Sequence, residues 1–342
     1  MARRDVVVIG GSAGAIESVS EIVRGLPADF PAAIFVVVHF PGSVTSALPR
    51  ILTRAGALRA THPDNEAPIQ PGRIYVAPPD CHLFIEEGNV RLSRGPKENG
   101  HRPAIDPLFR SAAHHYGSRV VGLLLSGNLS DGTAGLVSVK QRGGIVIVQD
   151  PESALYSGMP RSAIERVPVD HVVPVQAMAG LLEQLTAEAA PSRKDVAMES
   201  SRHDDGTLDE VAVEDRKTQA GIPSTMSCPE CHGVLWEHRD GDVLAFRCRV
   251  GHAFTEEALL AIQAEQLEAA LWTALRALEE HSALSRRLAA RAVHRGYSHS
   301  ASTFTEHAMD AEHHASTIRS VLSTGVRDKV AAAGVLEHGP ES

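Results

Sequence analysis

The chain has 342 residues, of which 22% are charged and 43% hydrophobic, and its formal net charge is −9 at pH 7. This negative charge argues against a general nucleic-acid binder and against binding to an anionic membrane surface. No apolar run reaches the roughly 18 residues of a membrane span, and no signal-peptide core precedes the first predicted strand, so we expect a cytoplasmic protein without membrane insertion.

Strands and helices are predicted to alternate over residues 5–185. The predicted strands are apolar runs at Val6–Ile9, Ile34–Val38, Ile74–Ala77, Val120–Leu125, Gly144–Val148 and His171–Val173. The predicted helices fall near residues 15–25, 44–54, 105–116, 133–142, 160–166 and 175–187. Continuous apolar strands that alternate with helices predict an α/β fold, a doubly wound and mostly parallel sheet with helices on both faces. Leu83–Glu86 and Asn89–Leu92 predict a small antiparallel hairpin beside it.

The composition changes after residue 187. A stretch rich in Ser, Asp, Glu, Arg and Lys has no apolar period and predicts a linker. Apolar residues then recur at helical spacing in two stretches, the second stepping through Phe304, Ala308, Ala311, Ala315, Ile318 and Leu322. We therefore expect an α/β domain (1–187), a polar linker (188–224), a cysteine-rich module (225–255), a helical hairpin (256–325) and a tail (326–342).

The first strand ends in a glycine-rich turn, Gly10-Gly11-Ser12-Ala13-Gly14. One interpretation is a nucleophile elbow, in which glycines allow a sharp strand-to-helix turn that exposes the Ser12 hydroxyl. The other is a glycine loop that binds a nucleotide. A dinucleotide fold usually carries an acidic residue near the end of its second strand, whereas this strand ends at His39. His39 therefore favours the nucleophile.

Ser12, His39 and Asp131 each follow a different predicted strand. Functional groups gather at the carboxyl ends of parallel strands, so we expect these three to meet. A serine attacks a carbonyl at neutral pH only when an imidazole takes its proton, and a carboxylate orients that imidazole. Amides after Ser12 would form part of an oxyanion hole. Taken singly, each residue is more often a turn or cap residue than a catalytic one, and it is their joint placement at strand ends that favours catalysis.

The segments that carry these residues resemble the catalytic segments of the chemotaxis receptor methylesterase (CheB) family. They read Gly-Gly-Ser12-Ala-Gly, Val-Val-His39-Phe-Pro and Leu-Ser-Gly-Asn-Leu-Ser-Asp131-Gly, and further segments that start at Pro71, Arg102 and Asp150 resemble the same family. The resemblance implies that Ser12, His39 and Asp131 form a catalytic triad. It also implies hydrolysis of γ-glutamyl methyl esters on chemoreceptor helices, and many members of the family deamidate receptor glutamines as well.

The sequence departs from the family pattern at a few positions. Ala13, Ala15 and Asn128 stand where the family commonly has threonine, glycine and methionine. The first predicted strand begins at residue 5, so we expect no receiver domain ahead of it.

Four other motif residues are expected to be structural rather than catalytic: Arg102, Asp106, Met159 and Pro160. Asp106 is expected to cap the helix that begins at Pro107. Some of the four residues are expected to line the substrate groove.

A second constellation predicts a structural zinc site. The spacing of Cys228, Cys231, Cys248 and His252 is that of a Cys3His zinc ribbon, with a hairpin between the two pairs. Four protein ligands leave no position for substrate, so the ion is expected to stabilise the module rather than to catalyse, and no cofactor is expected in catalysis. The alternatives are His232 as the fourth ligand, or three reduced cysteines without a metal.

Two functional hypotheses follow. The first is a cytoplasmic protein-glutamate methylesterase whose protein substrates are methylated chemoreceptor helices. The second is a catalytically weak or inactive scaffold of the same fold that binds proteins through the zinc ribbon and the helices. In either case the C-terminal helices are expected to mediate self-association or to dock a partner helix.

Overall fold

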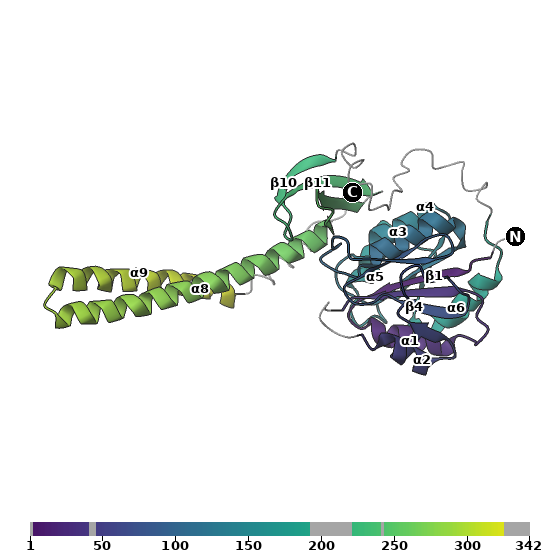
Figure 1. The fold of residues 1–342 in the computed structure, drawn as a ribbon, viewed down its shortest axis with the longest axis horizontal. Helices are drawn as coiled ribbons and strands as arrows, with labels where there is room; N and C mark the ends of the chain where they lie inside the picture. The colour runs from purple at the N-terminus through teal and green to yellow at the C-terminus, as the bar shows by residue number, and fades with distance from the viewer. Residues whose placement is uncertain (1–2, 41–45, 192–220, 241–242, 325–342) are drawn as a thin grey trace, which may run out of the picture. The chain divides into compact units, whose positions relative to one another are not determined.

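The fold is that of a computed structural model, which describes residues 3–40, 46–191, 221–240 and 243–324 (Figure 1). The chain divides into two compact units, Met1–Leu259 and Leu260–Ser342. The first unit contains the predicted α/β domain and the cysteine-rich module.

A seven-stranded sheet forms the centre of the first unit, in the order β3-β4-β2-β1-β7-β8-β9. Each neighbouring pair of these strands is parallel. The strands are β1 (Val6–Gly11), β2 (Ala33–Val38), β3 (Arg59–Thr61), β4 (Arg73–Val76), β7 (Val120–Leu124), β8 (Ile145–Gln149) and β9 (His171–Val173). The short edge strand β3 was not predicted, because three residues with an exposed arginine give no apolar run.

Helices cover both faces of this sheet. α1 (Ala15–Gly25), α2 (Leu48–Ala55) and α6 (Val175–Ala187) lie on one face, and α3 (Ile105–Tyr116), α4 (Thr133–Gln141) and α5 (Gly158–Arg166) lie on the other (Figure 1). Alternate side chains of β1 pack into two different hydrophobic cores. Val7 and Ile9 pack on the side of α1, α2 and α6, and Val6 and Val8 pack on the side of α3, α4 and α5. The predicted doubly wound fold is thus confirmed.

The predicted antiparallel hairpin is also present. It consists of β5 (His82–Ile85) and β6 (Val90–Ser93), which pair antiparallel and pack on the α3 side of the sheet. The helix predicted from residue 44 begins at Leu48, and residues 41–45 lie outside the described part of the chain.

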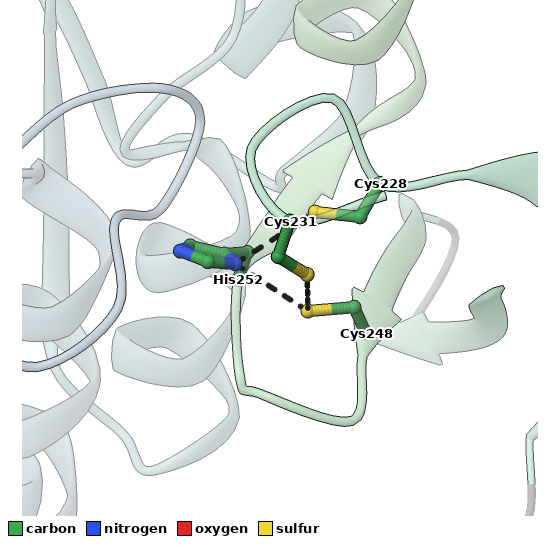
Figure 2. A group of neighbouring side chains, drawn as sticks. All are labelled: Cys228, Cys231, Cys248 and His252. Carbon is green, nitrogen blue, oxygen red and sulfur yellow. Dashed lines mark hydrogen bonds between the residues drawn. The ribbon is translucent and has the colours of Figure 1, made fainter. Parts of the chain in front are cut away.

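The cysteine-rich module is a four-stranded antiparallel sheet in the order β10-β11-β12-β13. Its strands are β10 (Ile222–Ser227), β11 (Val234–Asp240), β12 (Val243–Cys248) and β13 (Ala253–Thr255). The turns that precede β11 and β13 bring four side chains together, those of Cys228, Cys231, Cys248 and His252 (Figure 2). The predicted β11–β12 hairpin is present, whereas β10 begins inside the predicted linker. The rest of that linker, residues 192–220, lies outside the described residues.

Two long helices follow, α8 (Glu256–His294) and α9 (Ser298–Ser323). In the second unit they form a hairpin, whose turn contains Gly296 at a φ of 76°. Ala308, Ala311 and Ala315 are buried, as their seam spacing predicts. Among the described residues, no helix combines the length and the apolar character that crossing a membrane requires.

Candidate functional site

The site lies at the point where the chain reverses its winding direction across the sheet. From β1 the strands proceed one way through β2 and the other way through β7, so β1 lies between them. Ser12 follows β1 directly and His39 follows β2 directly. Asp131 lies in the loop that leads from β7 to α4. Such a switch point leaves a crevice at the carboxyl ends of the strands, where ligands bind in open α/β sheets.

The Ser12 turn has the geometry of a strand-to-helix elbow. Gly14 adopts a left-handed conformation, with φ 78°, and precedes the first residue of α1. The Ser12 amide donates to the Ser126 carbonyl at 2.9 Å, which ties the turn to the loop after β7. Within the described residues, the N–H groups of Ala13 and Gly14 donate to no protein acceptor. These amides at the start of α1 are therefore free to bind a developing oxyanion.

His39 and Asp131 form a buried pair. His39 Nε2 lies 2.7 Å from Asp131 Oδ2, and the two side chains are only 7% and 3% exposed. When Nε2 carries the proton that this bond uses, Nδ1 is the free acceptor of the ring. Among the described residues, no hydrogen bond joins the Ser12 hydroxyl to His39. Such contacts often form only once substrate is bound.

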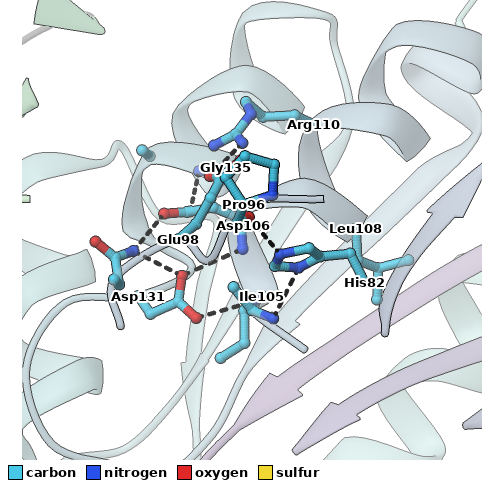
Figure 3. A network of polar contacts seen from close by, with 12 residues as sticks. His82, Pro96, Glu98, Ile105, Asp106, Leu108, Arg110, Asp131 and Gly135 are labelled. Atoms are coloured by element: carbon cyan, nitrogen blue, oxygen red, sulfur yellow. Dashed lines mark hydrogen bonds and ion pairs between the residues drawn. The ribbon is translucent and has the colours of Figure 1, made fainter. Parts of the chain in front are cut away.

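Asp131 accepts hydrogen bonds on both oxygens (Figure 3). The Ile105 amide donates to Oδ2 at 2.7 Å, while the Asp106 amide and Asn99 Nδ2 donate to Oδ1 at 3.3 and 2.9 Å. Burial alone would raise the pKa of Asp131, but the hydrogen bond and charge of His39 and the Ile105 amide hold that pKa well below its usual range. Asp131 is therefore a carboxylate at neutral pH.

Asp106 does not cap the helix that was predicted to begin at Pro107. α3 begins at Ile105, and it is the Asp131 carboxylate that binds its first amides. Asp106 Oδ1 instead accepts from the amides of Gly132 and Gly135 at 3.1 and 2.7 Å, at the start of α4. Burial and then the negative charge of Asp131 raise the pKa of Asp106. Asp106 therefore caps a helix, as predicted, but the prediction named the wrong one: the capped helix is α4 and not α3.

His101 was not singled out from the sequence. Its ring stacks on that of His39, with centroids 3.8 Å apart and planes 15° from parallel. Burial and then the neighbouring His39 lower the pKa of His101 from 6.5 to about 4. His101 is therefore neutral at neutral pH and packs flat against His39. A histidine that precedes Arg-Pro in a loop carries no pattern from which this contact could be read.

Replacing His101 with phenylalanine is expected to make the fold less sensitive to acid. The folded-state pKa of His101, about 4, lies below the ordinary 6.5, so between these values the unfolded chain is protonated at His101 and the folded chain is not. The free energy of unfolding therefore falls as the pH drops from about 6.5 towards 4. Between pH 7 and pH 5 the variant should lose about 2 kcal/mol less unfolding free energy than the wild type. Urea unfolding at both pH values measures this, and equal losses in the two proteins would contradict it.

The remaining motif residues brace the loops. Arg102 binds Asp80 Oδ1 through Nε and Nη2, at 2.9 and 2.6 Å. Met159 is fully buried beside Gly127. A Cβ on Gly127 would lie 2.0 Å from Met159 Sδ and 2.9 Å from Ser12 Cβ, so only glycine fits between them. Arg102 therefore supports the loop that carries Asp80, and Met159 supports the loop beside Ser12. Pro160 lies in the first turn of α5 and is buried.

The Cys3His group fits a tetrahedral metal site. Cys231 Sγ lies 3.6 Å from Cys248 Sγ, and His252 Nδ1 lies 3.7 and 3.5 Å from the sulfurs of Cys228 and Cys248. All four ligand atoms lie within 4.8 Å of one another. Tetrahedral zinc bonds separate sulfur and nitrogen ligands by about 3.5–3.8 Å. The group could thus hold a metal ion, and it contains His252 rather than His232.

Comparison with known proteins supports the assignment of the first unit. A Thermotoga maritima crystal structure, that of a CheB methylesterase catalytic domain, superposes with a TM-score of 0.51 at 37% identity, covering 53% of this chain and 98% of that one. A protein-glutamate methylesterase/protein-glutamine glutaminase of Anaeromyxobacter dehalogenans is 40% identical over 185 residues, which cover 54% of each protein.

A Leptospira interrogans protein named putative protein-glutamate methylesterase/protein-glutamine glutaminase is 37% identical over 182 residues, covering 53% of this chain and 94% of that protein. The chain spans about half the length of the first curated relatives it matches. Residues 7–182 match the sequence profile of the CheB methylesterases. With that match and the superposed fold, the chain belongs to the CheB methylesterase family.

Proposed function

We propose that the protein is a protein-glutamate methylesterase, a serine hydrolase that removes methyl groups from glutamate side chains of chemoreceptors. The observation that carries this proposal is the buried hydrogen bond of His39 to Asp131, next to the Ser12 turn, in a chain of this family. The relatives are also named for glutaminase activity. A glutamine side chain offers the same kind of carbonyl, so deamidation is a further reaction to assay.

In the proposed reaction Ser12 Oγ attacks the carbonyl carbon of the methyl ester while His39 Nδ1 takes the serine proton. The amides of Ala13 and Gly14 stabilise the oxyanion. His39 then protonates the departing methoxide, and methanol leaves a glutamyl ester on Ser12. His39 next takes a proton from water, which attacks this ester. His39 then gives that proton to the departing Ser12 Oγ, which releases the glutamate and restores the serine hydroxyl. Asp131 holds the imidazole in the required tautomer and stabilises its cationic form.

The surface around Ser12 suits a protein helix. Leu129, Leu155 and Tyr156 are apolar and are 38%, 74% and 42% exposed. They lie on the loops after β7 and β8, and the Tyr156 carbonyl accepts the Gly127 amide at 2.9 Å. Exposed apolar side chains beside a reactive group are suited to the apolar face of an amphipathic helix. We therefore infer that the substrate is a methylated receptor helix.

We also propose that Cys228, Cys231, Cys248 and His252 bind a structural zinc ion. The fit of their separations to a tetrahedral site supports zinc, and a complete set of four ligands leaves no open position for catalysis. All four cysteines of the chain, including Cys81, lack disulfide bonds. Reduced thiols and a zinc module support the cytoplasm as the place of action.

The competing hypothesis is a scaffold that binds proteins without hydrolysing esters. The α8–α9 hairpin leaves several large apolar side chains exposed, among them Leu267, Trp272, Leu284 and Met309. These support self-association or docking of a partner helix through the hairpin. A binding role of the helices is compatible with either hypothesis, but the buried His39–Asp131 pair favours an enzyme.

A methylated chemoreceptor fragment tests the proposed function. The wild-type chain is expected to release methanol from the methylated fragment and to leave free carboxylates at the methylated glutamates, as mass spectrometry of receptor peptides would show. An unmethylated fragment serves as the control. A scaffold would bind the fragment without releasing methanol, and that result would contradict the proposal.

A further inference from the structure

The turn Glu98–His101 points the side chain of Asn99 at Asp131. The Glu98 and His101 backbones pair through both of their amides, at 3.2 and 2.9 Å. Asn99 and Gly100 form the turn between them, with φ values of 51° and 77°. Asparagine tolerates such left-handed backbone better than most residues, and here its side chain points inward, with Asn99 only 6% exposed.

The Asn99 amide group connects the active site to the cysteine-rich module. Its Nδ2 donates to Asp131 Oδ1 at 2.9 Å and to Asp106 Oδ2 at 3.1 Å. Its Oδ1 accepts the Thr255 amide of β13 at 2.8 Å. Both side-chain hydrogens and the carbonyl oxygen are therefore used, and one buried side chain joins the catalytic carboxylate to the module.

β13 holds the same turn through its backbone. The backbone N–H of Asn99 donates to the Ala253 carbonyl at 2.7 Å, and the backbone N–H of Ala253 donates to the Lys97 carbonyl at 3.3 Å. Ala253 follows His252, a member of the Cys3His group. Lys97 Nζ also pairs at 3.0 Å with Oε1 of Glu230, which lies between Cys228 and Cys231 in the sequence. The position of the Glu98–His101 turn thus depends on β13, whose first residue, Ala253, directly follows the proposed metal ligand His252.

The module also contacts the residue that precedes Asp131. The hydroxyl of Ser130 lies 2.8 Å from that of Thr255 and donates to Glu257 Oε2 at 2.8 Å. Glu257 in turn pairs with Arg166 of α5. Ser130, Thr255 and Phe254 are almost completely buried. These contacts hold the Asp131 loop from a second side.

We propose that Asn99 is a positioning residue for Asp131, and that the folded, metal-holding module keeps Asn99 in place. Without β13 the Asn99 carbonyl loses its donor and the turn loses its backbone partner, so Asp131 loses a hydrogen bond that fixes its direction towards His39. This inference rests on the proposed esterase function and adds that the module supports catalysis.

Four samples of the full-length chain test this inference: wild type, chelator-treated wild type, Asn99→Ala and chelator-treated Asn99→Ala. Asn65→Ala is the matched control, because Asn65 Oδ1 likewise accepts a backbone amide, that of Leu92, away from Asp131. Asn99→Ala should lower kcat by about 10- to 100-fold with KM changed less than threefold, as expected for a lost hydrogen bond to a charged group.

Metal removal should lower the wild-type kcat by at least a similar factor, because it also loosens the Ser130 contacts. The combined loss in chelator-treated Asn99→Ala should stay well below the product of the two single losses, because both changes act through Asp131. A wild-type kcat in Asn99→Ala, fully multiplicative losses, or a faster chelator-treated enzyme would overturn the inference. The chelator arm tests the inference even if Asn99→Ala fails to fold.

A second measurement does not depend on activity. The proton between His39 and Asp131 should give a downfield NMR signal in the wild type and in Asn65→Ala, and this signal should shift or broaden in Asn99→Ala and after metal removal. An unchanged signal in both of those samples would overturn the inference. A wild type that hydrolyses no ester but shows these NMR changes would instead refute only the proposed function.

Discussion

Asparagine in place of Asp131 is expected to lower kcat for methyl ester hydrolysis by a factor on the order of 10⁴. An amide nitrogen cannot accept the bonds that the carboxylate now receives from His39 Nε2 and the Ile105 amide. If the amide oxygen takes the place of Oδ2, the amide nitrogen meets the donors Asn99 Nδ2 and Asp106 N at the place of Oδ1. If the amide nitrogen takes the place of Oδ2, it donates to His39 Nε2, and the ring proton moves to Nδ1. His39 then has no free nitrogen for the Ser12 proton.

The control for this prediction is Asp170→Asn. Asp170 also accepts a backbone amide, that of Val146 at 2.9 Å, but it lies outside the site. Its substitution should leave kcat unchanged. Circular dichroism and steady-state kinetics on both variants measure the outcome. A folded Asp131→Asn protein with kcat within tenfold of the wild type would show that Asp131 does not orient the catalytic base.

The wild-type chain is expected to contain one zinc ion, and Cys248→Ser is expected to lose it. Replacement of groups that merely support metal ligands lowers metal affinity about 10- to 100-fold, so loss of a ligand should exceed about 100-fold. Because a sheet as small as β10–β13 depends on its metal to fold, hydrogen exchange in residues 222–255 should become fast. Through Asn99, the same variant should also lose esterase activity.

Cys81→Ser provides a matched control, since Cys81 is a free cysteine outside the Cys3His group. It should retain one zinc per chain and slow exchange in the module. Elemental analysis and hydrogen-exchange mass spectrometry are the measurements. A metal-free but folded wild type, or stoichiometric zinc in Cys248→Ser, would refute the structural zinc site.

The sequence predicts much of the central sheet because its strands are buried on both faces and therefore read as continuous apolar runs. The same runs locate their carboxyl ends, and with them Ser12, His39 and Asp131. β3 and β10 were missed for a physical reason: their exposed, polar positions resemble loop sequence. Two helices begin at other residues than predicted, α2 at Leu48 and α5 at Gly158, because apolar periodicity does not fix the first residue of a helix.

The contacts around the carboxylates could not be predicted, because they join distant parts of the chain. Asn99 binds the Thr255 amide 156 positions away. Asp106 lies in α3 but caps α4, since the two helices pack side by side on one face of the sheet. His101 and Asn99 gain their environment only when the turn closes against Asp131. Residue type and spacing carry no signal for such pairings.

Methanol release by wild type and Ser12→Ala, at matched concentrations of folded protein on the same methylated receptor fragment, tests the central claim most directly. Removal of the nucleophile leaves only binding and oxyanion stabilisation, so the variant rate should fall by at least about 10³-fold. Equal rates in the two proteins would show that Ser12 is not the nucleophile and would contradict the account.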